Sequence, residues 1–88
     1  MATENQLQER REEVRHNVRG YLAERPAVAF HPNTIARSPL VQATLEEVQD
    51  ALNVLVSLGQ AEQVKDTLGA TPYYKATGAG ILAHERNE

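Results

Sequence analysis

The stretch that decides the fold reads Thr44-Leu-Glu-Glu-Val-Gln-Asp-Ala-Leu-Asn-Val-Leu-Val-Ser-Leu-Gly59. Thr44 begins a Thr-x-x-Glu capping box, and Gly59 can take the left-handed conformation that often follows a helix. Between them, apolar residues recur at the spacing of one helical face: Leu45, Val48, Ala51, Leu52, Leu55 and Leu58. Val54 and Val56 lie at the margins of this face and widen it. We therefore expect residues 45–58 to form a central helix that contacts more than one neighbouring element.

The composition indicates a single globular domain over residues 1–88, with 41% apolar residues and no cysteine. Disulfides and thiolate metal sites are therefore excluded. The first residues lack the charged-then-apolar pattern of a signal peptide, and no apolar run approaches membrane-spanning length. We expect a cytoplasmic protein without a cofactor.

Charge is divided unevenly along the chain, whose formal net charge is −3. Residues 1–40 hold six arginines against five glutamates, a balance of +1. Residues 41–88 hold three basic residues against seven acidic ones, a balance of −4. The predicted central helix therefore lies in the acidic half.

Residues 4–24 are predicted to form a long first helix, which begins with a capping box at Thr3 and ends before Pro26. Its early turns lack a dense apolar stripe, so they either project from the core or pack on a second copy of the chain. The arginines at positions 11, 15 and 19 follow one flank. They form either a solvated ridge, paired locally with Gln8 and Glu12, or a ridge that faces phosphates or a partner.

The residues before the central helix predict two short elements. Residues 27–30 form an apolar run suited to a brief edge strand. Residues 33–38 then form a short helix, capped by His31 or Asn33 and stopped by Ser38-Pro39. Its inward-facing residues are expected to be Ile35, Ala36 and Leu40.

After Gly59 the pattern changes from helical spacing to that of strands. Residues 61–66 and 72–76 read as the two strands of a hairpin, because the residues between them favour turns. A weak terminal helix is expected at 78–85, with Ile81 and Leu82 available for burial.

The predicted order of elements resembles the winged-helix version of the helix-turn-helix fold, a mainly α architecture with a small β-hairpin. Residues 33–38 correspond to the supporting helix, 45–58 to the recognition helix and 61–76 to the wing. The stretch from Ala51 to Glu62 is similar to the family's passage from recognition helix to wing. Residues 73–81, Tyr-Tyr-Lys-Ala-Thr-Gly-Ala-Gly-Ile, are similar to the Tyr-x-x-Thr-x-x-Gly ending of small bacterial and phage regulators. The likeness covers residues 10–83 and departs at Ala76, where leucine is more usual.

The resemblance implies a transcriptional regulator that binds double-stranded DNA, with the recognition helix in the major groove and the wing on the backbone or minor groove. The implied base readers are Gln49 and Asn53, whose amides can bond adenine. Phosphate contacts would come from Gln42, Thr44 and Ser57, and positive charge from Arg37, Lys65 and Lys75. The long first helix suggests a homodimer.

An alternative is that the winged helix binds another protein and not DNA. Glu46 and Asp50 share the exposed face with Gln49 and Asn53, and affinity for DNA depends largely on Lys and Arg. The acidic face therefore favours a protein partner, and both functions stay open at the level of the sequence.

The sequence does not indicate an enzyme. His16, His31 and His84 lie in three separate elements without the spacing of a metal-ligand pair. The pair of glycines at 78 and 80 lacks the third glycine and the strand–helix context of a dinucleotide-binding loop. No catalytic or metal-binding residue is assigned.

Overall fold

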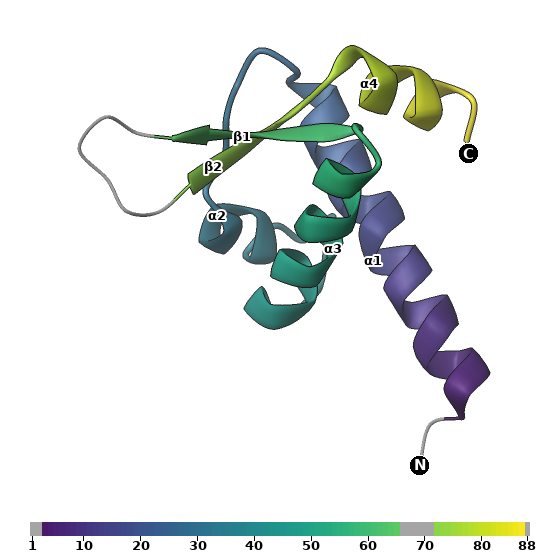
Figure 1. The fold of residues 1–88 in the computed structure, drawn as a ribbon. Coiled ribbons are helices and arrows are strands. Elements are labelled where there is room, and N and C mark those ends of the chain that lie inside the picture. Colours follow the sequence, from purple (N-terminus) through teal and green to yellow (C-terminus); the bar gives the residue numbers. More distant parts are fainter. Residues whose placement is uncertain (1–2, 66–71, 88) are drawn as a thin grey trace.

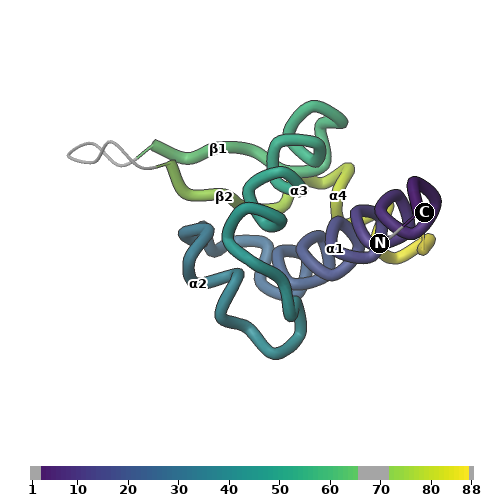
Figure 2. Tube along the Cα trace, turned by 90° about the horizontal axis from the view of Figure 1, so that it is seen from below, coloured from purple at the N-terminus to yellow at the C-terminus, as the bar shows by residue number. Residues whose placement is uncertain are grey.

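The computed structural model describes residues 3–65 and 72–87. Its order is α1 (Glu4–Glu24), α2 (Pro32–Ala36), α3 (Leu45–Ser57), β1 (Ala61–Lys65), β2 (Pro72–Ala76) and α4 (Gly78–Glu85). Strands β1 and β2 form an antiparallel hairpin, called the wing below. Figures 1 and 2 show the wing extending from one side of the molecule and the N-terminal half of α1 from the other. The prediction of a mainly α fold with a small hairpin is confirmed.

Helices α1 and α3 begin with the capping boxes that the sequence indicates. Thr3 accepts a hydrogen bond from the Gln6 amide, and Thr44 accepts one from the Glu47 amide at 3.1 Å. In both boxes the side chain at the third helical position bonds back to the cap amide. These local bonds satisfy amides that have no partner within the helix, which explains why both starts can be read from sequence.

The prediction for the second helix, residues 33–38, is wrong at both ends. Helix α2 begins at Pro32 because His31 caps it, with Nδ1 accepting from the Asn33 amide at 3.0 Å. It ends at Ala36, and Arg37 is its C-cap. Pro39 disfavours helical geometry at Ser38, so the helix stops earlier than predicted.

The strand predicted at residues 27–30 is reduced to one bridge. Phe30 pairs with Tyr74, with N–H···O distances of 2.8 and 2.9 Å. The wing itself pairs Ala61 with Ala76 at its base and Lys65 with Pro72 at its far end. The predicted turn at residues 66–71 lies outside the described residues.

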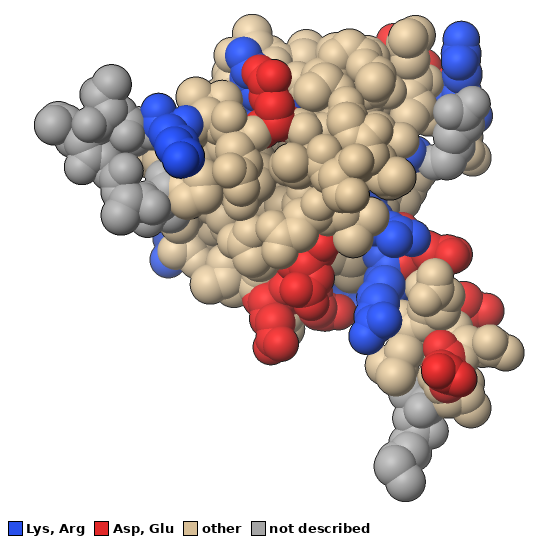
Figure 3. All heavy atoms as spheres, viewed as in Figure 1, with Lys and Arg blue, Asp and Glu red and all other residues tan. Residues whose placement is uncertain are grey.

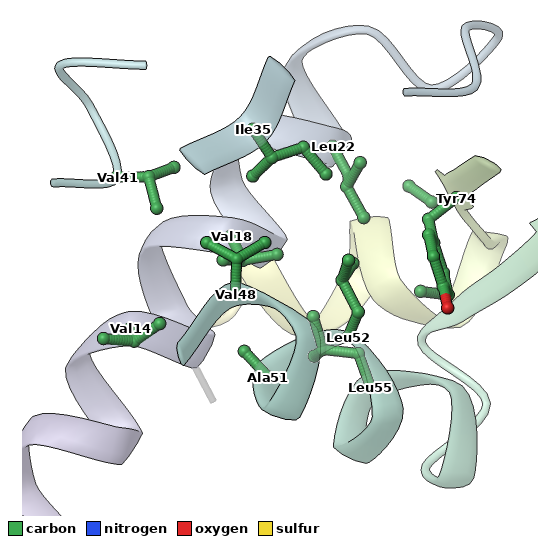
Figure 4. Close-up of a cluster of buried hydrophobic side chains, with 12 residues drawn as sticks. Val14, Val18, Leu22, Ile35, Val41, Val48, Ala51, Leu52, Leu55 and Tyr74 are labelled. Atoms are coloured by element: carbon green, nitrogen blue, oxygen red, sulfur yellow. The ribbon is translucent and has the colours of Figure 1, made fainter. Parts of the chain in front are cut away.

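The core lies where α1, α2, α3 and β2 meet (Figure 4). Its fully buried side chains include Val18, Leu22, Ile35, Leu52 and Tyr74, and Figure 4 shows the Tyr74 ring at one side of this cluster. Val41, which the sequence suggests only as part of a connection, is completely buried. Buried residues of α3 run only from Val48 to Leu55, the middle of the helix.

Several apolar residues expected inside are exposed. Leu45 and Leu58 are 48% and 60% exposed, because the two ends of α3 extend past the elements that cover its middle. Leu40 is 64% exposed, since α2 ends before it, and Leu82 points outward from α4. Helical spacing identifies a face correctly, but it does not tell how far along the helix that face is covered.

Thr77 and Gly80 join the wing to the end of α3. The Thr77 hydroxyl donates to the Gly59 carbonyl at 2.6 Å and accepts from the Gly80 amide, so it also caps α4. At Gly80 an added Cβ would clash with the Gln60 carbonyl oxygen, so the close approach requires glycine. The Tyr-x-x-Thr-x-x-Gly pattern therefore has a structural role here, because it fixes α4 against the turn that follows α3.

Candidate nucleic-acid interface

The two predicted base readers lie side by side on α3. Gln49 Nε2 donates to Asn53 Oδ1 at 3.2 Å, the contact expected of residues four apart on a helix. Asn53 is exposed and Gln49 is half-buried. We call Gln49 and Asn53 the amide pair.

Tyr74 connects the amide pair to the wing. Its hydroxyl accepts from Gln49 Nε2 at 3.0 Å and from Gln63 Nε2 at 3.2 Å. Tyr74 is 1% exposed, so the two side-chain amides supply donors to a hydroxyl oxygen that is buried away from solvent. The exposed face of α3 is thereby held in a defined position relative to β1 and β2.

The two acidic residues of the predicted reading face lean to the other side of α3. Glu46 and Asp50 line a groove of about 250 Å³ between α3 and α1, opposite Arg11 and Arg15. The exposed surface of α3 is therefore divided, with amides on the wing side and carboxylates on the α1 side. In Figure 3 the red carboxylates gather over the lower end of α3, and blue side chains lie between them and α1.

Arg10 binds the start of α3 directly, a contact that sequence reasoning missed. Its Nε donates to Glu47 Oε2 at 2.9 Å and its Nη2 to the Gln42 carbonyl at 2.9 Å. The hydrogen bond from Arg10, with further bonds from Thr44, holds the pKa of the Glu47 carboxyl below its ordinary value. The carboxylate at the start of α3 thus carries both the cap and a tertiary ion pair.

The predicted arginine ridge on α1 is only partly a ridge. Gln8 bonds Glu12 at 3.3 Å, whereas the predicted pairing of the arginines with these two residues is not found within residues 3–65 and 72–87. Arg19, however, is only 6% exposed, and its Nη1 donates to Gln60 Oε1 at 3.4 Å. The expectation of a continuous exposed row is therefore wrong at Arg19, because α4 and the turn after α3 cover that part of α1.

The predicted basic residues do not act as one group. Lys75 forms an ion pair with Glu62 at 3.1 Å, because the two are direct cross-strand partners in the wing. Lys65 is exposed at the end of β1, and Arg37 is exposed at the end of α2. In Figure 3 the blue side chains are accordingly scattered: some lie near the wing, some beside α1 and some at the end of α4.

The remaining predicted contacts lie around α3. Thr44 and Gln42 stand at its start, where the Thr44 hydroxyl serves as cap acceptor and the Gln42 carbonyl binds Arg10. Gln42 has a positive φ of 49°, which lets the chain turn into the helix. Ser57 is exposed in the last turn. Gln42 and Ser57 are both exposed, and they lie before and after the amide pair along the chain.

The histidines belong to structural contacts. His31 caps α2, and the rings of His16 and His84 lie 5.2 Å apart between α1 and α4. Burial lowers the pKa of His84, and the nearby His16 and Arg19 lower it further. Within residues 3–65 and 72–87, no three His, Cys, Asp or Glu residues are arranged to hold a metal ion. In the same ranges, no helix is long and apolar enough to cross a membrane.

Three residues missing from the predicted site are connected to it: Arg10 bonds Gln42, Tyr74 bonds Gln49, and the Gln63 side chain, among the described residues, bonds only Tyr74. Only Tyr74 carries a sequence signal, since alternation in β2 places it on the inner face with Ala76. Its hydroxyl needs a partner when buried, and that requirement points toward polar side chains on a neighbouring element.

The comparisons with known proteins concern the fold. No protein-family model matches the chain, and no curated protein matches it in sequence. Among solved structures, the Staphylococcus aureus MepR–DNA complex has a TM-score of 0.71 at 21% identity and covers 84% of this chain. MepR, a transcription regulator of the S. aureus multidrug efflux pump MepA, has a TM-score of 0.69 at 22% identity over 83% of this chain. This chain spans 59% and 52% of those two MepR chains. The winged helix-turn-helix fold predicted from the sequence is thereby confirmed.

Proposed function

We propose that this chain binds double-stranded DNA through α3 and the wing and acts as a small transcription regulator in the cytoplasm, without catalytic activity. The observation that carries the proposal is the exposed amide pair on the helix that corresponds to the recognition helix. Asparagine and glutamine amides match the donor and acceptor pattern of adenine in the major groove. The structural likeness to MepR, which has been crystallised with DNA, supports this use of the fold.

The groups that would contact DNA are arranged around the amide pair. Gln42, Thr44 and Ser57 at the two ends of α3 would contact phosphates, and Lys65 and Lys75 would place positive charge along the wing. Arg37 adds a further charge from the C-terminal end of α2. Because Glu62 already pairs with Lys75, we expect Lys65 to contribute more to non-specific affinity than Lys75.

One observation favours the alternative, a winged helix that binds a protein. Glu46 and Asp50 are exposed on the first turns of α3, where they would repel phosphates and could pair with a basic partner. Under this alternative, Glu46→Gln and Asp50→Gln weaken the complex with that partner, and DNA affinity is negligible.

A titration of the purified protein with fluorescent random-sequence duplexes at low salt tests the proposal. We expect binding at tens of micromolar or tighter, since non-specific affinities are about 10⁻⁴–10⁻⁶ M at physiological salt. The affinity should fall steeply as salt rises, because each neutralised phosphate releases counterions. Asn53→Ala should relax sequence preference, and Lys65→Ala should weaken binding to all duplexes equally. No binding at tens of micromolar would exclude the DNA function.

We also propose that α1 pairs with its copy in a homodimer. The first three turns of α1 project beyond the core, whose α1 members begin at Val14, and Leu7 is 48% exposed there. Leu7 lines the groove between α1 and α3, and apolar Val14, Ala51 and Val54 line the same groove. A second α1 in this groove would bury Leu7 on both copies of the chain.

Sedimentation of two matched variants tests the dimer. Leu7→Glu should lower the apparent mass, whereas Leu82→Glu should not, although the two leucines are equally exposed at 48% and 49%. Deletion of residues 1–8 should have the same effect as Leu7→Glu. A deletion that leaves the mass unchanged but lowers the melting temperature strongly would show that these residues belong to the monomer.

A further inference from the structure

We propose that the Tyr74 hydroxyl sets the base preference of Gln49, by restricting this residue to the use of its amide oxygen. This inference rests on the proposed DNA-binding function and names the bases that one position of α3 would accept. Tyr74 itself would not touch DNA, because it is 1% exposed; it is a positioning residue.

The backbone holds the Tyr74 hydroxyl in place from both sides. The backbone N–H of Tyr74 donates to the Phe30 carbonyl at 2.9 Å, and the Tyr74 carbonyl accepts from the Phe30 N–H at 2.8 Å. On the opposite side of Tyr74, its cross-strand partner is Gln63 of β1. Tyr74 and Gln63 therefore form a non-hydrogen-bonded cross-strand pair, in which side chains lie close together. The ring is packed in the core, so the position of the hydroxyl is determined by the fold and not by DNA.

Both protons of the Gln49 amide nitrogen are used inside the protein. One is donated to the Tyr74 hydroxyl at 3.0 Å and the other to Asn53 Oδ1 at 3.2 Å. A side-chain amide has only these two donors, so Gln49 has none left for a base. Within residues 3–65 and 72–87, no hydrogen bond engages Gln49 Oε1 or Asn53 Nδ2.

This arrangement gives the two amides different abilities. Gln49 can only accept, so it suits the exocyclic amino groups of adenine (N6) and cytosine (N4) and disfavours guanine and thymine. Asn53 keeps both donors and one free lone pair on Oδ1, so it can still bond adenine in a bidentate manner. Without the bond to Tyr74, Gln49 would have a donor for adenine N7 and would favour adenine over cytosine.

The test is selection from a pool of random duplexes, followed by titration with the selected site and its single-base variants. The Gln49→Ala variant identifies which position of the selected DNA site Gln49 contacts, because the base preference at that position should disappear. There, the wild-type protein should bind adenine and cytosine duplexes about equally and both better than guanine or thymine. Tyr74→Phe should favour adenine over cytosine by roughly five-fold or more, the smallest discrimination expected of a bidentate contact.

Gln63→Ala is the matched control, because it removes the other donor to the same hydroxyl and leaves the Gln49 bond in place. The Gln63→Ala variant should keep the wild-type base preference at the position that Gln49 contacts. If Tyr74→Phe lowers all preferences together, the hydroxyl acts on the fold alone and the proposal is wrong.

Two readouts on the unmodified protein keep the proposal testable should Tyr74→Phe fail to fold. A wild-type preference for adenine over cytosine at the Gln49 position would overturn it. So would side-chain amide NMR spectra in which neither Gln49 Nε2 proton shows a contact with the Tyr74 ring. These failures differ from failure of the DNA function, because a protein that binds no duplex at all would overturn both proposals.

Discussion

Arg10 and Glu47, 37 residues apart in the chain, form an ion pair at 2.9 Å that ties α1 to the first turn of α3. The same guanidinium bonds the Gln42 carbonyl, and the same carboxylate bonds the Thr44 amide that it caps. One pair of side chains thus fixes the angle at which the chain enters the proposed recognition helix.

We expect Arg10→Met to lower the free energy of unfolding by about 0.5–1 kcal/mol, the range for a well-aligned but solvent-accessible pair. Methionine keeps most of the apolar stem, so the change reports mainly on the charge. Arg11→Met is the control, since Arg11 forms no ion pair within the described residues. Urea denaturation at low and high salt measures the free energy of unfolding of both variants. An equal loss in the two variants would show that the effect does not come from the bond to Glu47.

Two glycines in α4 should respond oppositely to alanine. Gly80→Ala places a Cβ against the Gln60 carbonyl, so we expect a loss of about 1–3 kcal/mol, as for an overpacked core. Gly78→Ala meets nothing within 4 Å and should be neutral or stabilising by up to about 1 kcal/mol. Thermal melts of both variants decide the matter. Stabilisation by Gly80→Ala would mean that α4 does not lie against the turn after α3.

The burial of α3 predicts unequal losses at its leucines. Leu52→Ala should cost about 2–5 kcal/mol, because Leu52 is completely buried. Leu58→Ala should cost under about 0.5 kcal/mol, since its side chain is 60% exposed, although helical spacing places it on the same face. Val54→Ala should fall between them. Similar losses at Leu52 and Leu58 in denaturant melts would contradict the observed packing.

Stability should depend on pH through His84. Its pKa is lowered in the folded protein, so the unfolded chain takes up a proton at a higher pH than the folded chain. The free energy of unfolding should therefore fall as the pH drops below about 6.5 and level off below the folded-state pKa. Protonation would place the new charge beside His16 and Arg19 of α1, with Glu85 of α4 lining the same cavity.

His84→Gln should remove most of this dependence between pH 7.5 and pH 5.5. The lowered pKa of Glu47 acts in a separate, more acidic range, where its stabilisation is lost as the carboxylate is protonated. If the free energy of unfolding of His84→Gln depends on pH as steeply as that of the wild type, His84 is not the source of this dependence.

Neutralising the carboxylates of α3 should separate the two functional classes. If the chain binds DNA, Glu46→Gln with Asp50→Gln should raise non-specific affinity for random duplexes, because two charges near phosphates are removed. We expect a gain of several-fold at low salt that shrinks as salt rises. Glu62→Gln in the wing should act similarly by releasing Lys75. Unchanged DNA affinity in both variants would place the carboxylates away from the bound duplex.

The helix starts and turns that are fixed by contacts between residues close in sequence could be predicted from the sequence. The capping boxes at Thr3 and Thr44 join residues three apart, and the turn at Gly59 needs only one positive φ. Such signals depend on local backbone geometry, which is why the starts of α1 and α3 agree with expectation. The amide pair was likewise predictable, because its members stand one helical turn apart.

The chemistry of the candidate interface was decided by tertiary structure. Tyr74 reaches Gln49 across 25 residues and Arg10 reaches Glu47 across 37, and no periodic pattern encodes either contact. Arg19 looks like an exposed residue in sequence, yet α4 and the turn after α3 bury it. Helical spacing assigns side chains to a face, whereas burial and hydrogen bonding depend on what packs against that face. For this protein, the sequence by itself therefore determined the order of the elements and the helix that carries the candidate site. Packing decided which polar groups on that helix are left without a partner inside the described part of the protein.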